Sequence, residues 1–369
     1  MAERQPSKLH VAGSNPVSRS IPTFDRTVAG RRAAIAEQSL RLRRALTVTI
    51  RPGPSLTTEA RALSTAYRSG RPPTDPSGHV HDAASAAAYA AARMPATFSA
   101  IARALAATAE RLPGFRPTSL LDVGAGTGAG AWAASAIWPS VAELSLLDRE
   151  PTAIDLGRRL ATASGGAVPA AANWRVGRLE IGPPATPADV VTAAYVLGEI
   201  PPGNVAAVIE RLWAATRDIL VLVEPGSPDG FERIRAARTD LIAAGGHVVA
   251  PCPGDAPCPL TGRAWCHFLA RLDRSPLQRG AKGATRSWED EPFSYVAIGR
   301  ASATRAATPA ARVVLGRPRQ RPGMVELRIC VDGRIDVRTL SRRDGPAWRT
   351  ARDLEWGDPV PAEVLRAGR

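Results

Sequence analysis

Four cysteines are the residues of this chain with the clearest metal chemistry. Cys252, Cys258 and Cys266 fall within one short stretch, and Cys330 follows much later. Their neighbours are rich in Pro, Gly and Asp, which is not typical of buried structural cysteines. Four thiolates fit a tetrahedral zinc ion or a [4Fe–4S] cluster, and the C-x5-C-x7-C spacing is wider than the C-x2-C of zinc ribbons. The pattern predicts a metal site, in which His267 could replace one thiolate around zinc; free cysteines, a disulfide and a redox pair are the alternatives.

A glycine-rich turn is the second candidate site. The heptapeptide Asp-Val-Gly-Ala-Gly-Thr-Gly follows a short apolar run and begins at Asp122, which we also expect to contact the cofactor. Gly124, Gly126 and Gly128 permit a tight turn and let the backbone approach a ligand closely. Dinucleotide-binding folds use G-x-G-x-x-G, whereas G-x-G-x-G behind an acidic residue is the loop of class I S-adenosylmethionine methyltransferases. Asp148 ends the next apolar segment and can accept hydrogen bonds from both hydroxyls of a ribose.

The sequence after the fourth predicted strand differs from that of amino-methylating enzymes. Those enzymes carry Asn/Asp-Pro-Pro-Tyr/Phe there to hold the target nitrogen, whereas residues 193–199 read Ala-Ala-Tyr-Val-Leu-Gly-Glu. The dipeptide Pro251-Cys252 resembles the nucleophile of cytosine C5 methyltransferases but lies beyond the fifth strand. The sequence therefore predicts cofactor binding and identifies no catalytic residue.

Alternating strands and helices must position the glycine loop. Strands are expected at residues 119–123, 143–147, 173–176, 189–194, 218–223, 247–249 and 294–298, and helices at 152–163, 205–216 and 231–244. Repeated strand–helix units indicate a doubly wound, mostly parallel sheet. We therefore predict an α/β fold of the class I methyltransferase (Rossmann-like) type at residues 117–299, with the cysteine loop at 251–268.

Segments with other patterns flank this sheet. Residues 1–30 mix Pro, Ser, Gly and Arg without periodicity, which predicts a disordered or loosely docked arm. Residues 31–116 show helical spacing and alanine-rich runs, which predicts a helical N-terminal domain. Short strand-like stretches at residues 311–315, 325–331 and 334–340 predict a small basic, β-rich domain at 300–369.

Positive charge is concentrated in the flanks. The 369-residue chain has a net charge of +14, from 48 basic and 34 acidic residues. Residues 1–116 carry 17 basic and 7 acidic residues (+10), residues 117–299 carry 16 and 19 (−3), and residues 300–369 carry 15 and 8 (+7). This distribution favours an anionic partner, and nucleic acid is the usual large polyanion. The candidate RNA contacts are Arg271, Lys282, Arg342 and Arg343.

Composition excludes some classes of protein. No stretch approaches the ~18 uncharged apolar residues that a membrane span needs, so we expect no membrane partner. The N-terminal residues lack the apolar run of a secretory signal, but their basic, acid-poor character is compatible with an organellar transit peptide. We expect a cytoplasmic protein in a bacterium or a mitochondrial matrix protein in a eukaryote, monomeric and without an obligate protein partner.

Several motifs together resemble the methyltransferase-like family of the mitochondrial small ribosomal subunit and its bacterial relatives. They are LLDVGAGTGAG, VLGEIP, VEPGSPDGF, PCP-x4-CPL, WCHF, EDEPFSY, SRRDG and EWGD, between about residues 85 and 360. The resemblance implies S-adenosylmethionine contacts at Gly124, Gly126, Gly128 and Asp148. It also implies a [4Fe–4S] cluster held by Cys252, Cys258, Cys266 and Cys330, in preference to zinc. The implied partner is the small ribosomal subunit with its rRNA, during assembly or translation.

Three functions fit these features of the sequence. The first is an S-adenosylmethionine-dependent rRNA methyltransferase of the small subunit that carries a [4Fe–4S] cluster. The second is an assembly factor that binds the same cofactor and partner but methylates nothing, which the missing target-binding motif would fit. The third is a small-molecule methyltransferase with a structural zinc loop, for which the basic flanks have no explanation.

Overall fold

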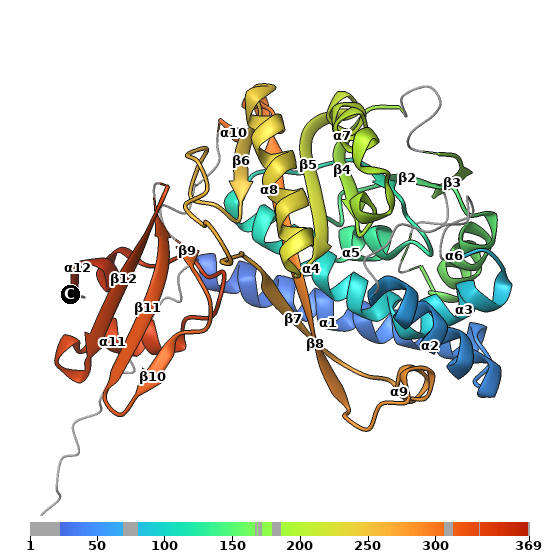
Figure 1. The fold of residues 1–369 in the computed structure, drawn as a ribbon, viewed down its shortest axis with the longest axis horizontal. Helices are drawn as coiled ribbons and strands as arrows, with labels where there is room; N and C mark the ends of the chain where they lie inside the picture. Colours follow the sequence, from blue (N-terminus) through green and yellow to red (C-terminus); the bar gives the residue numbers. More distant parts are fainter. Residues whose placement is uncertain are drawn as a thin grey trace, which may run out of the picture.

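The structure is a computed structural model that describes residues 23–68, 80–166, 168, 172–178, 186–305, 313–331 and 333–367. Figure 1 shows a large body of helices around a sheet and, beside it, a small sheet from the C-terminal residues. No helix in these ranges is long and apolar enough to cross a membrane.

An eight-stranded mixed sheet lies at the centre of the large body. Its order is β3-β2-β1-β4-β5-β8-β6, and β7 pairs with the first half of β8. The strands are β1 (Ser119–Val123), β2 (Glu143–Asp148), β3 (Asn173–Val176), β4 (Ala188–Ala194), β5 (Thr216–Pro225), β6 (His247–Ala250), β7 (Phe268–Asp273) and β8 (Trp288–Gly299). Strands β1 to β5 are parallel, and β8 runs antiparallel between β5 and β6. The predicted class I methyltransferase fold is confirmed by this topology.

Helices cover both faces of the sheet. One layer contains α4 (Met94–Arg111), α5 (Ala129–Ile137) and α6 (Pro151–Ala163), and the other contains α7 (Val205–Ala214) and α8 (Pro228–Ala243). Leu120 of β1 belongs to the first core and Leu121 to the second, because successive strand side chains point to opposite faces. Burial on both faces explains why this strand is a continuous apolar run.

The N-terminal helices share a core with the sheet. They are α1 (Thr23–Thr49), α2 (Pro54–Arg68) and α3 (Ala83–Ala92), followed by α4. Buried Leu46 and Leu63 belong to the same hydrophobic cluster as β1 and β2. Helix α1 begins eight residues before the expected start of the helical domain at residue 31. The rest of the predicted arm, residues 1–22, lies outside the described residues.

A hairpin of β7 and β8 extends beyond the main sheet, and its first strand was not among those expected from the sequence. Residues 288–293 of β8 pair with β7, and α9 (Pro276–Lys282) connects the two strands and packs against α2 and α3. The Ser275 side chain accepts a hydrogen bond from the Gln278 amide, and Pro276 occupies the first turn of α9. A Ser-Pro pair is a recognised helix start, so the sequence did contain a signal for α9.

The C-terminal residues form a separate four-stranded sheet with its own core. The elements are β9 (Val313–Val314), β10 (Arg319–Arg321), β11 (Met324–Val331), β12 (Arg334–Ser341), η3 (Arg342–Asp344), α11 (Pro346–Asp353) and α12 (Ala362–Ala367). This segment is thus less purely β than expected, because two helices pack on one face of the sheet. Val325, Leu327 and Ile329 face those helices. Cys330 points to the opposite face because strand side chains alternate.

Candidate functional site

The glycine loop and the end of β2 form one hydrogen-bonded unit. The Gly124 amide donates to the Leu147 carbonyl at 2.9 Å. The Gly126 amide donates to Oδ2 of Asp148 at 2.7 Å, and the Glu150 amide donates to Oδ1 at 2.9 Å. The Asp148 carboxylate therefore lies beside the loop at the carboxyl ends of the strands, where open α/β sheets bind ligands.

A cavity of about 600 Å³ lies at this edge of the sheet, and Gly124, Gly126 and Asp148 line it. Its volume is within the range of small-molecule sites. Burial raises the pKa of Asp148, and hydrogen bonds from backbone amides oppose that shift. A carboxylate has about four acceptor positions, so Asp148 can still accept from a ligand diol after bonding two amides. A Cβ at Gly126 would lie 3.8 Å from a ring carbon of Tyr89, an ordinary van der Waals distance, so Tyr89 borders the cavity beside the loop.

The structure places Asp122 and Gly128, which we expected to contact the cofactor, behind the loop. Asp122 is 2% exposed, accepts from the Thr192 hydroxyl at 2.7 Å, and has no partner for Oδ2 in the structure. Burial raises the pKa of Asp122 to about 7. A Cβ at Gly128 would lie 2.6 Å from a ring carbon of Trp174. These two residues shape the loop from its buried side.

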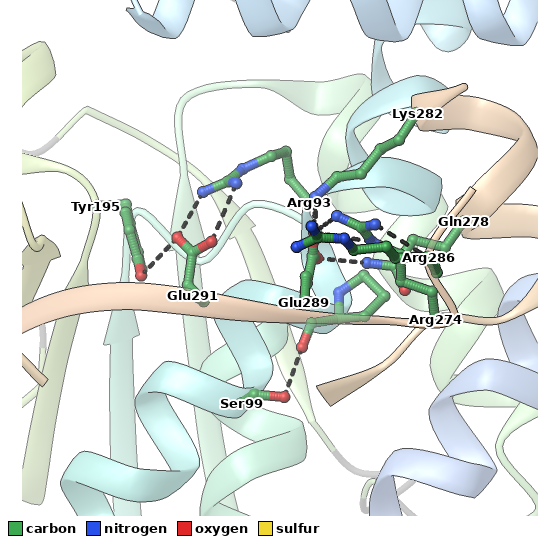
Figure 2. Close-up of polar contacts among 10 residues, drawn as sticks. Arg93, Ser99, Tyr195, Arg274, Gln278, Lys282, Arg286, Glu289 and Glu291 are labelled. Atoms are coloured by element: carbon green, nitrogen blue, oxygen red, sulfur yellow. Dashed lines mark hydrogen bonds and ion pairs between the residues drawn. The ribbon is translucent and has the colours of Figure 1, made fainter. Parts of the chain in front are cut away.

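A network of charged and polar side chains borders the same cavity. Tyr195 follows β4 with φ 60°, a left-handed conformation that aromatic residues rarely adopt. Its hydroxyl donates to Glu291 at 3.2 Å, and Arg93 donates to both Glu291 oxygens at 2.8 and 3.2 Å (Figure 2). Tyr195 and Arg93 both line the cavity, close to where amino-methylating enzymes hold their target. Strained residues of this kind are frequent at functional sites.

The network of Tyr195, Glu291 and Arg93 was not expected from the sequence. Glu291 is 96 residues from Tyr195 and 198 from Arg93, so no local spacing connects the three. The available signal is the acidic run at residues 289–291 beside an apolar strand, because a buried carboxylate requires a partner.

The four cysteines line a second cavity, of about 290 Å³. Cys252, Cys258 and Cys266 belong to the loop between β6 and β7, and Cys330 comes from β11 of the C-terminal sheet. All four are reduced thiols of intermediate exposure. The structure therefore brings the distant fourth cysteine to the clustered three.

The thiols are close enough for their charges to shift the pKa of Cys266, but they do not converge on the position of a single metal ion. Burial raises the pKa of Cys266 well above its ordinary value, and the charges of Cys252, Cys258 and Cys330 raise it further. Within the described ranges, no three or more His, Cys, Asp or Glu side chains are arranged to hold a metal ion. Four thiols around a shared cavity fit a group larger than one ion, and four thiolates are the ligand set of a [4Fe–4S] cluster.

His267, the candidate substitute for a thiolate, packs in an aromatic stack. Its ring centroid lies 5.5 Å from that of Trp265 and 4.2 Å from that of Trp356. Burial lowers the pKa of His267. The ring therefore serves as a packing surface between the cysteine loop and the C-terminal segment.

Two of the candidate RNA contacts lie on the β7–α9–β8 hairpin and form ion pairs. Arg271 donates to both carboxylate oxygens of Asp290 at 2.8 and 2.9 Å. Lys282 lies 2.6 Å from Glu289, which also pairs with Arg274 (Figure 2). The Lys282 side chain is only 19% exposed, and burial lowers its pKa. Lys282 is therefore well placed to hold the hairpin together.

The other two candidate RNA contacts lie on the C-terminal domain. Arg342 and Arg343 are exposed on η3, directly after β12. The Arg342 guanidinium lies 5.9 Å from the centroid of the Trp348 ring. Both side chains are accessible to a partner.

Comparison with known protein families confirms the resemblance that the motifs indicate. The profile described as "Mitochondrial small ribosomal subunit Rsm22" matches residues 83–361. The chain belongs to the Rsm22 family. This match includes the glycine loop, the cysteine loop and Cys330.

Curated relatives agree with the Rsm22 assignment. The human protein "Ribosome assembly protein METTL17, mitochondrial" is 32% identical over 305 residues, which cover 74% of this chain and 62% of METTL17. The Schizosaccharomyces pombe "Rsm22-cox11 tandem protein 2, mitochondrial" is 25% identical over 293 residues, which cover 66% of this chain and 38% of the yeast protein. The chain thus spans less than two thirds of the length of these relatives.

Solved structures with some likeness include small-molecule methyltransferases. Magnesium protoporphyrin IX methyltransferase from Synechocystis, with bound S-adenosylmethionine, is 13% identical with a TM-score of 0.37, covering 56% of this chain and 80% of that one. Precorrin-6y C5,15-methyltransferase from Geobacter metallireducens is 16% identical with a TM-score of 0.34, covering 53% and 85%.

Proposed function

We propose that this protein is an assembly factor of the small ribosomal subunit that binds S-adenosylmethionine, rRNA and a [4Fe–4S] cluster. The observation that carries the proposal is the cavity shared by four cysteines from two parts of the fold. Membership of the Rsm22 family and the name of the human relative support the ribosomal partner. The protein would act where small subunits assemble, in the cytoplasm of a bacterium or the mitochondrial matrix of a eukaryote.

The cofactor proposal rests on the cavity beside the glycine loop. Asp148 would accept hydrogen bonds from the ribose hydroxyls, and the backbone at Gly124 and Gly126, which lines the cavity, would lie against the cofactor. When bound, S-adenosylmethionine supplies an electrophilic methyl group. The Tyr195 hydroxyl and its partner Glu291 would border the space available to a target group.

Calorimetric titration with S-adenosylmethionine tests this site. Asp148→Asn should weaken binding by about 10- to 100-fold, since hydrogen bonds to a charged group contribute about 1.5–3 kcal/mol. Asp155→Asn is the matched control, because its 69% exposed carboxylate lies on α6 and pairs with Arg158. Equal affinities for the two variants would contradict the assignment of Asp148.

Methylation of rRNA is the enzymatic form of this proposal, and binding without methylation is the second candidate. The Tyr195 conformation and its bond to Glu291, in place of a target-binding motif, favour binding alone. Nucleoside analysis of small-subunit rRNA, with and without the protein, separates them. A methylated nucleoside that requires the protein identifies an enzyme, whereas assembly defects with unchanged nucleosides identify a factor that only binds.

Anaerobic purification with metal analysis tests the cluster. We expect a broad absorption shoulder near 400 nm that bleaches with dithionite, and about four irons per chain. Cys258→Ser should lose both the colour and the iron. About one zinc per chain with no colour would instead support the structural zinc loop.

A further inference from the structure

Two buried arginines lie near the four cysteines: Arg238 lines the cysteine cavity, and Arg111 lies close to Cys252. Arg111 ends α4 and is 7% exposed, and Arg238 lies within α8 and is 6% exposed. Arginine is almost never so buried unless it is paired. Both guanidinium groups are close enough to the Cys252 thiol to oppose the rise in its pKa that burial causes.

Neither arginine has a carboxylate partner in the described part of the chain. Nη2 of Arg238 donates to the carbonyls of Gly254 at 2.8 Å and Ala256 at 2.7 Å, which holds the loop between Cys252 and Cys258. Nε of Arg238 and Nη1 of Arg111 are buried without a partner in the structure. Arg238 at the cavity wall and Arg111 close to Cys252 thus each keep one buried N–H group without a hydrogen-bond partner.

Buried cations of this kind require a negative charge nearby, because removing a guanidinium from water is costly unless a counter-charge compensates it. Four thiolates around a dicationic [4Fe–4S] core leave a net charge of about −2. The charges of the two arginines are opposite in sign to this charge.

We infer that Arg111 and Arg238 are the counter-ions of an anionic cluster in the cysteine cavity. They are positioning residues that act on the cluster through charge and through hydrogen bonds toward its sulfur ligands. The inference rests on the proposed cluster and adds two residues from α4 and α8 to its site. Because reduction adds one more negative charge, both arginines should favour the reduced form and raise the reduction potential.

A redox titration with dithionite, followed by visible absorption, tests this role on the full chain. Arg111→Gln and Arg238→Gln should each lower the reduction potential of the cluster. A tenfold change in the equilibrium constant of this one-electron reduction corresponds to about 59 mV. Arg111→Lys and Arg238→Lys retain the charge and should stay near the wild-type value. Arg41→Gln is the control, because Arg41 lies on α1, does not line the cavity, has a 41% exposed side chain and pairs with Glu37.

The outcomes separate this inference from the proposed function. A wild-type protein without iron would overturn both. A wild-type cluster whose potential is unchanged in the two Gln variants would overturn the arginine role and leave the cluster standing. If Arg238→Gln fails to fold because it loses its bonds to Gly254 and Ala256, Arg111→Gln still decides the result.

Discussion

At the scale of single residues, Asp122 gives the fold a pH dependence of defined sign. Its carboxyl is buried, and its pKa is raised to about 7. Below about pH 4 the Asp122 carboxyl is protonated in both the folded and the unfolded chain, so it does not make the free energy of unfolding depend on pH. Between about pH 4 and 7 only the unfolded chain ionises, so the free energy of unfolding should fall by up to about 1.4 kcal/mol per pH unit. Above pH 7 the fall should level off.

Thermal unfolding of Asp122→Asn across this pH range checks the prediction. The Asn side chain retains an acceptor for the Thr192 hydroxyl and does not titrate. Between pH 4 and 7 the free energy of unfolding of the variant should therefore fall less steeply than that of the wild type. Parallel curves for the two proteins would mean that another group is responsible.

Gly128 provides a steric prediction at the same scale. Gly128→Ala should destabilise the protein by about 2–4 kcal/mol, because φ is +91° and the new Cβ would lie 2.6 Å from Trp174. Chemical denaturation measures this loss. Gly114→Ala is the control, since no atom lies within 4 Å of its Cβ and its φ is not left-handed, and it should change stability little. Gly128→Ala with wild-type stability would contradict the packing described.

At the scale of elements, the β7–α9–β8 hairpin depends on the Glu289 cluster. Lys282→Met removes one of two cations from Glu289 and should destabilise the protein by about 1–3 kcal/mol. Lys282→Met should leave the salt dependence of RNA binding unchanged, because Lys282 is already paired with Glu289.

Arg343→Gln should retain the stability of the protein and reduce the slope of log affinity against log salt concentration by about 0.7–0.9.

Denaturation and RNA titrations at several salt concentrations compare the two variants. Lys282→Arg is the conservative control for the ion pair with Glu289. If Lys282→Met reduced the slope of log RNA affinity against log salt concentration without changing stability, Lys282 would be an RNA contact after all.

At the scale of the whole molecule, the cysteine cavity connects the C-terminal sheet to the α/β body. Only Cys330 of its four thiols belongs to the C-terminal sheet. Loss of the proposed cluster in Cys330→Ser should therefore increase hydrogen exchange in β11 and β12 and weaken RNA binding. Exchange in β1, β4 and β5 should stay unchanged, because these strands belong to a separate core. A colourless variant that binds RNA as well as the wild type would refute this coupling.

Much of the fold was predictable because it follows from local pattern. The expected strands at 119–123 and 173–176 coincide with β1 and β3, and the expected helix at 152–163 matches α6 within one residue. Apolar runs and helical spacing are properties of neighbouring residues, so they can be recognised without knowledge of the tertiary structure. Strand β7 was missed because its charged residues, among them Arg271, obscure the pattern and find their partners only across the hairpin.

By itself, the sequence determined the fold class, the glycine loop with Asp148, and the four cysteines as a candidate metal site. These features depend on residue type and on short spacing along the chain. Only the tertiary structure decided that Cys330 joins the other three thiols, that Arg111 and Arg238 flank them, and that Lys282 is held by Glu289. Each of these contacts depends on how separate elements dock, and docking is driven by burial of apolar surface over the whole core, which no local pattern records.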